Sequence, residues 1–147
     1  MRALRIRRSL LGLLAVAAFI STSAFACKGT ATHKVTVAQH NFRFAVQAFQ
    51  DAEIAEHDKG FVPDDLHVRM QSTIQKVALG GKDLDDALAA GASAPTIKAK
   101  LDAIYALLDS LNTDGVLSIK NPTTKASLEV ALDGIKAIID NALTAMS

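Results

Sequence analysis

The sequence has few of the residues on which several common functions depend. Its 147 residues contain no tryptophan, one tyrosine (Tyr105) and one cysteine (Cys27). Proteins that bind single-stranded nucleic acids stack the bases on aromatic side chains, so the sequence predicts no nucleic-acid partner. One cysteine cannot form an intramolecular disulfide, and we therefore expect the fold to be stabilised by packing alone.

Motifs that carry chemistry are also missing from the sequence. It has no C-x-x-C-H haem motif, no H-E-x-x-H zinc motif and no G-x-S-x-G nucleophile motif. The stretch Gly80-Gly81-Lys82 is followed by Asp83 and does not complete a phosphate-binding loop. With no nucleophile beside a base, the sequence predicts a protein that is not an enzyme and uses no cofactor.

The N-terminal segment has the composition of an export signal. Arginines at positions 2, 5, 7 and 8 precede an apolar run from Leu10 to Ile20, and Ala24-Phe25-Ala26 supplies the small-x-small pattern of a cleavage site. A bilayer core of about 30 Å needs about 20 apolar residues, so this run is too short to remain as a membrane span. We expect residues 1–26 to be a cleaved signal peptide.

Cleavage after Ala26 would leave Cys27 as the first residue of the mature chain. The sequence Ala24-Phe25-Ala26-Cys27 resembles the lipobox of bacterial lipoproteins. This resemblance implies lipid attachment at Cys27, a membrane as partner, and a periplasmic location or an anchor in the outer membrane. If Cys27 carries no lipid, we expect a secreted protein. Residues 27–32 would form a short tether.

Residues 33–147 are long enough for one domain, and their pattern is helical. Without the signal peptide, 12 Lys and Arg face 15 Asp and Glu, a formal charge of −3, and no basic stripe remains. Apolar residues recur at spacings of three and four in four segments, with representative members Val35, Phe42 and Phe49; Leu66, Met70 and Ile74; Ile97, Leu101 and Ile104; Leu128, Leu132 and Ile135. The pattern predicts an all-α fold, an antiparallel up-down four-helix bundle.

Two features of this bundle are specific enough to test. The second helix contains Gly80-Gly81, and because each glycine costs about 1 kcal/mol relative to alanine inside a helix, we expect a kink or break there. The third helix, from Pro95 to Leu111, is shorter than the others. We expect Val116, Leu117 and Ile119 to form a short turn or helical cap over the exposed end of the bundle.

Acidic residues and histidines concentrate around the first connection. Glu53 and His57 lie four residues apart on one helix, and Asp64 and His67 lie three apart on the next. Nitrogen and oxygen ligands of this kind suit zinc or copper. The alternative is that these are solvated residues at helix ends, with the acids in the first turn where the helix dipole favours them.

The first helix carries more apolar residues than one buried stripe requires. Val37 and Phe44 lie off the main stripe. They either pack against a neighbouring helix or form a contact for another protein or for a second copy of the chain.

These features lead to two functional expectations. The first is a small exported helical protein, anchored by lipid, that acts as a structural or protein-interaction module at the cell envelope. The second is a periplasmic bundle that binds a metal or a small ligand through the residues between positions 53 and 67.

Overall fold

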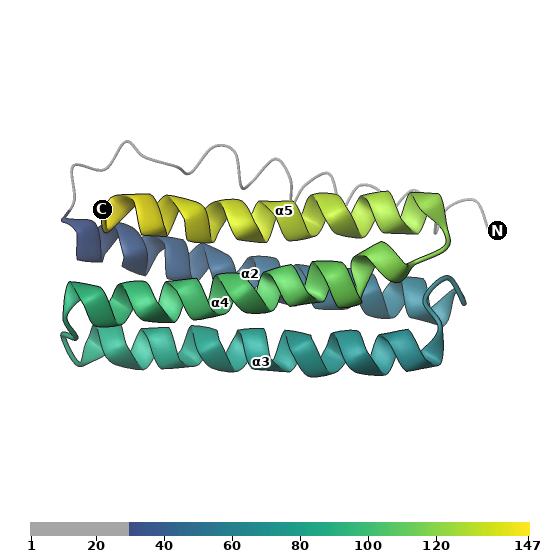
Figure 1. The fold of residues 1–147 in the computed structure, drawn as a ribbon, viewed down its shortest axis with the longest axis horizontal. Helices are drawn as coiled ribbons and strands as arrows, with labels where there is room; N and C mark the ends of the chain where they lie inside the picture. The colour runs from purple at the N-terminus through teal and green to yellow at the C-terminus, as the bar shows by residue number, and fades with distance from the viewer. Residues whose placement is uncertain (1–29) are drawn as a thin grey trace.

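The computed structural model describes residues 30–147, which form four long helices and one 3-10 turn (Figure 1). The predicted signal peptide and Cys27 lie outside the described residues. The elements are α2 (Ala31–Asp58), α3 (Asp64–Ala89), α4 (Ala94–Asp114), η1 (Val116–Ser118) and α5 (Pro122–Ala145). The first helix therefore begins two residues earlier than the domain boundary expected at residue 33.

The helices form the expected antiparallel up-down four-helix bundle. Each helix packs against the one before it in the chain, and α5 returns to pack against α2, which closes the ring (Figure 1). The fold class predicted from apolar spacing is thus confirmed. In the part of the chain that the structure describes, no helix combines the length and hydrophobicity needed to cross a bilayer.

Local signals in the sequence set the helix ends. The Asn121 side chain accepts hydrogen bonds from the backbone N–H groups of Thr123 and Thr124, and Ser93 accepts one from Thr96. Both residues satisfy donors that a helix start leaves without partners. Gly60 has φ of 77°, a left-handed conformation that favours glycine, and it allows the chain to reverse between α2 and α3.

The core is a continuous set of buried aliphatic and aromatic side chains contributed by all four helices. Phe42 and Phe49 from α2 and Met70 from α3 are among the largest fully buried side chains. The turn η1 buries Val116 and is followed by the buried Ile119, so the predicted cap over the bundle end is confirmed, although Leu117 points to solvent. Helix α4 extends to Asp114, three residues beyond the expected end.

The break expected at Gly80-Gly81 is absent, since α3 is continuous through both glycines. A Cβ atom added at Gly81 would lie 2.8 Å from Cε1 of Phe42, and one at Gly80 would lie 3.1 Å from Cγ1 of Ile104. The glycines therefore let α3 approach α2 on one side and α4 on the other. Close packing, rather than a hinge, accounts for the pair.

Candidate functional site

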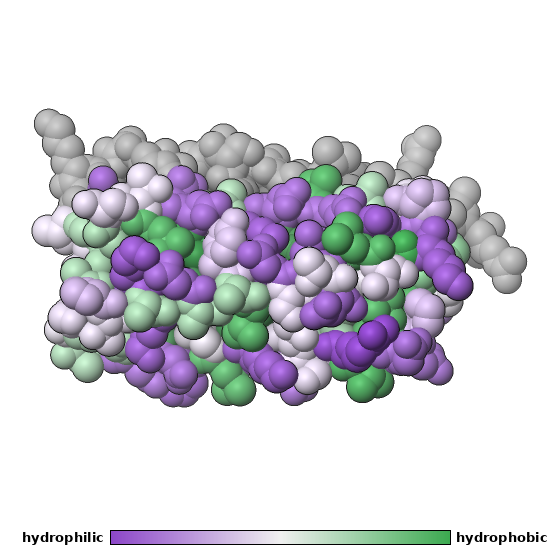
Figure 2. Space-filling model, in the orientation of Figure 1, coloured by the Kyte–Doolittle hydropathy of each residue, from purple (hydrophilic) through white to green (hydrophobic). Residues whose placement is uncertain are grey.

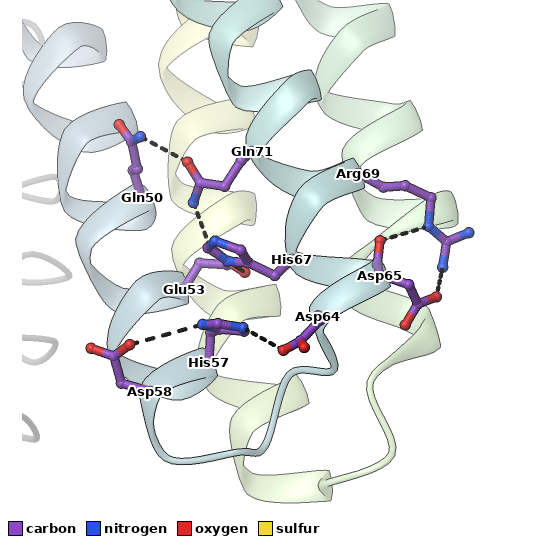
Figure 3. Close-up of polar contacts among 9 residues, drawn as sticks. All are labelled: Gln50, Glu53, His57, Asp58, Asp64, Asp65, His67, Arg69 and Gln71. Carbon is purple, nitrogen blue, oxygen red and sulfur yellow. Dashed lines mark hydrogen bonds and ion pairs between the residues drawn. The ribbon is translucent and has the colours of Figure 1, made fainter.

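The hairpin between α2 and α3 brings the predicted acid and histidine residues together. Figure 3 shows the group, which we call the hairpin cluster and define as Glu53 and His57 from α2 with Asp64, His67 and Gln71 from α3. The two helices meet here because the short turn through Gly60 reverses the chain.

Glu53 is the most deeply buried polar residue of the cluster, with 0% of its surface exposed. Its carboxylate lies 2.9 and 3.1 Å from Nδ1 of His67 and accepts a hydrogen bond of 2.5 Å from Nε2 of Gln71 (Figure 3). Gln50 in turn donates to the side-chain oxygen of Gln71. A buried carboxylate requires such partners, so these contacts tie α2 to α3.

The second histidine of the cluster faces solvent-exposed acids. Nε2 of His57 lies 3.0 Å from Oδ1 of Asp64, and its Nδ1 lies 3.8 Å from Oδ1 of Asp58. The rings of His57 and His67 are stacked, with centroids 3.9 Å apart and planes inclined by 20°. The interpretation of this region as solvated helix ends therefore holds for Asp64 but is wrong for Glu53.

The arrangement brings together the four residues named as possible metal ligands, but as two pairs. Glu53 contacts Nδ1 of His67, and Asp64 contacts Nε2 of His57, on two stacked rings. Among residues 30–147, no three side chains of histidine, cysteine, aspartate or glutamate are grouped so that they could hold one metal ion. In this geometry the cluster fastens two helices.

A separate polar contact at the same end of the bundle reaches a third helix. Thr124 near the start of α5 donates a hydrogen bond of 2.7 Å to Oε2 of Glu56, whose other oxygen contacts the ammonium group of Lys59. Polar contacts at this end of the bundle thus connect α2, α3 and α5.

Sequence reasoning missed the polar residues that belong to the core stripe of α2. The fully buried row is Val35, Gln39, Phe42, Val46, Phe49 and Glu53, with spacings of four and three throughout. Counting only apolar residues identified Val35, Phe42 and Phe49 correctly but passed over the two polar members, Gln39 and Glu53. The regular spacing was the signal that could have found Gln39, whose Nε2 donates to the carbonyl of Gly81, and the buried carboxylate.

The other candidate is a surface of α2 that no helix of the described chain covers. We call it the α2 outer face and define it as Val37, His40, Phe44, Ala48 and Asp51. Phe44 is 67% exposed and Val37 40% exposed, so their packing against a neighbouring helix is ruled out as an interpretation. His40 lies edge-on to Phe44, with ring centroids 4.9 Å apart.

Other large apolar side chains are exposed on α3, but they are more isolated. Val68 and Leu79 lie eleven residues apart, with the polar residues Ser72 and Gln75 between them on that side of the helix. Single apolar side chains of this kind are normal on protein surfaces, and on the face drawn in Figure 2 hydrophobic residues lie among hydrophilic ones. Val37 and Phe44 are seven residues, two helical turns, apart on one row.

A shallow groove between α3 and α4 is another surface feature of the described residues. It has a volume of about 580 Å³ and is lined by small or apolar residues such as Gly80, Ala99 and Leu107, with Asp83 and Lys100. Ligand sites usually combine an enclosed cavity with several convergent polar groups, which this groove lacks.

Comparison of the chain with models of protein families, with curated proteins and with solved structures finds no match.

Proposed function

We propose that the protein is a small exported helical module, anchored through lipid on Cys27, that makes protein contacts at the cell envelope through the α2 outer face. The observation that carries the proposal is the exposure of Phe44 beside Val37 at the middle of α2. Phe42, two residues away, is 1% exposed. Phe42 is therefore part of the core, whereas Phe44 lies on the surface of the bundle.

An exposed phenylalanine is a favourable centre for a protein contact. Burial of its side chain contributes about 1.5–3 kcal/mol, and aromatic residues are enriched where protein interfaces are most strongly held. The row on either side of it offers His40 and Asp51 as polar groups at the edge of such a contact. This combination of an apolar centre and a polar rim is typical of interfaces.

The position of Cys27 supports the anchoring part of the proposal. Helix α2 begins at Ala31, with the side chain of Thr30 accepting a hydrogen bond from the backbone of His33. A chain extends at most about 3.6 Å per residue, so a lipid on Cys27 would hold the start of α2 within about 14 Å of its attachment point.

Mass spectrometry of the mature N-terminus tests the anchor. The proposal predicts a chain that begins at Cys27 and carries the added mass of a diacylglyceryl group, with or without a third acyl chain. A chain that begins at an unmodified Cys27, or that retains the signal peptide, would contradict the anchor.

Photo-crosslinking in intact cells tests the contact. A photoreactive amino acid in place of Phe44 should give a covalent protein adduct, whereas the same amino acid in place of Val68 should not. Val68 is a suitable control because it is 65% exposed, almost as much as Phe44, but lies on α3. Equal adducts at both positions, or none at 44, would contradict the proposed contact.

A further inference from the structure

We propose that the partner of the α2 outer face is a second copy of this chain, with the two α2 helices paired antiparallel across Phe44. The proposal rests on the proposed function of this face as a protein contact. It is argued from the distribution of charge along α2 and from the position of Phe44 within the helix.

The charged residues of α2 are divided by sign at Phe44. Before it, the helix has Lys34 and Arg43 and no acid; after it, the helix has acids and neither lysine nor arginine, the acids being Asp51, Glu53, Glu56 and Asp58. Phe44 lies at the middle of the 28-residue helix. Glu53 is buried against α3 and Arg43 contacts Asp85, so the complementarity of α2 to a reversed copy of itself depends on Lys34 before Phe44 and on Asp51 and Asp58 after it.

The row of the outer face, continued to both ends of α2, carries histidines before Phe44 and carboxylates after it. His33 and His40 lie exposed before Phe44, and Asp51 and Asp58 lie exposed after it. In an antiparallel pair centred on Phe44, Asp51 faces Val37 of the second copy, one helical turn from its His40. Asp58 falls beside the first turn of the second α2, where the free N–H groups of a helix start favour a negative charge.

Other arrangements of two copies lack this complementarity. A parallel pair in register would place Asp51 against Asp51 and Asp58 against Asp58, and like charges across an interface disfavour association. An antiparallel pair is isologous, so it closes after two copies and leaves no further outer face free for growth.

The pairing also agrees with an anchored chain. The two α2 helices would start about 42 Å apart, at opposite ends of the pair, so both lipids reach one membrane when the helix axes lie along its surface. Tethering to a membrane raises the local concentration toward the millimolar range, where even a modest interface stays associated.

Sedimentation equilibrium of the purified mature protein, in non-ionic detergent if it is acylated, tests the pair. At about 100 μM, below the millimolar concentrations that tethering can reach, we expect the mass of two chains. Phe44→Asp should raise the dissociation constant by about tenfold or more, because it places a carboxylate at the interface centre. Val68→Asp, a matched change on α3, should leave it unchanged.

A charge exchange tests the direction of the pairing. His40→Asp and Asp51→Lys should each raise the dissociation constant by about two- to fivefold, and the double variant should return to near the original value, because the introduced carboxylate and ammonium group lie one helical turn apart across the pair. Asp65→Lys makes the same change on the exposed surface of α3 and should have no effect. Failure of the double variant to recover would overturn the antiparallel pair.

Crosslinking between copies of different isotopic mass gives an independent result. A photoreactive residue at position 40 should link to residues near positions 48–51 of the other copy. Links to positions near 40 would indicate a parallel pair and overturn the proposal. A single-chain mass for the natural sequence in the sedimentation experiment would overturn it as well.

The outcomes for this pair and for the proposed function are separable. If the crosslink from position 44 in cells captures a different protein while the purified chain stays single, the proposed function is supported and the self-pairing is overturned. If position 44 captures nothing in cells, the contact function and the pairing both fail.

Discussion

Nδ1 of His67 lies within 3.1 Å of both oxygens of the Glu53 carboxylate, which is completely buried between α2 and α3. The neighbouring His57, stacked on the same ring, faces the fully exposed Asp64 instead. Two histidines in contact therefore serve acids in opposite environments. Replacing each histidine in turn therefore compares the stability contributed by a contact to a buried acid with that contributed by a contact to an exposed one.

Replacement of His67 should destabilise the bundle more than replacement of His57. His67→Leu removes a hydrogen-bond partner of a buried carboxylate, and we expect the free energy of unfolding to fall by about 1–3 kcal/mol. His57→Leu leaves Asp64 to water and should cost less than about 1 kcal/mol. Both variants lose the ring stacking, so their difference isolates the buried contact. Chemical denaturation measures the free energy of unfolding of each variant. Equal losses in the two variants would contradict a larger role for His67.

Gly81→Ala should destabilise the protein, even though alanine has the higher helix propensity. The added Cβ would lie 2.8 Å from Cε1 of Phe42, and overpacking of this kind costs about 1–3 kcal/mol. In a Phe42→Leu background the ring is gone, so Gly81→Ala should cost less there than in the natural chain. A stabilising effect of Gly81→Ala in the natural chain would show that α2 and α3 are not closely packed at this point.

The amino group of Lys82 should titrate above its ordinary pKa of 10.5. Its Nζ donates a hydrogen bond of 2.6 Å to Asp86, whose charge also raises the pKa, as do Asp83 and Asp85 more weakly. Because the folded state has the higher pKa, the contribution to stability is present below pH 10.5 and is lost as the pH rises through the folded-state value. NMR titration should show a lower pKa in Asp86→Asn and no change in the control Asp102→Asn.

The sequence was sufficient to predict the bundle because its apolar spacing and its helix starts agree. Asn121 and Pro122 mark the start of α5, and Leu128, Leu132 and Ile135 give its buried row. Both signals are local, so one sequence is enough to recognise them. The short cap at Val116 followed from the limited length of α4, which is a property of a single segment.

Features that depend on contacts between helices could not be predicted in the same way. Gly80 and Gly81 weaken an isolated helix. In the bundle they allow α2 and α4 to pack closely against α3, and α3 stays continuous. Glu53 was expected to lie at a solvated helix end or to bind a metal. It is instead buried, and Gln71 from α3 donates a hydrogen bond to its carboxylate. Such partners lie far apart in the sequence and are identified only in the folded chain.

The central claim is that the α2 outer face is dispensable for folding and required for contact, and one comparison tests it most directly. Phe42→Ala and Phe44→Ala differ by two positions on the same helix, with exposed fractions of 1% and 67% in the natural residues. We predict that Phe42→Ala lowers the free energy of unfolding by about 3–5 kcal/mol. Phe44→Ala, measured by denaturation at low concentration, should change it by less than about 0.5 kcal/mol while weakening association. A large loss of stability in Phe44→Ala would contradict the account.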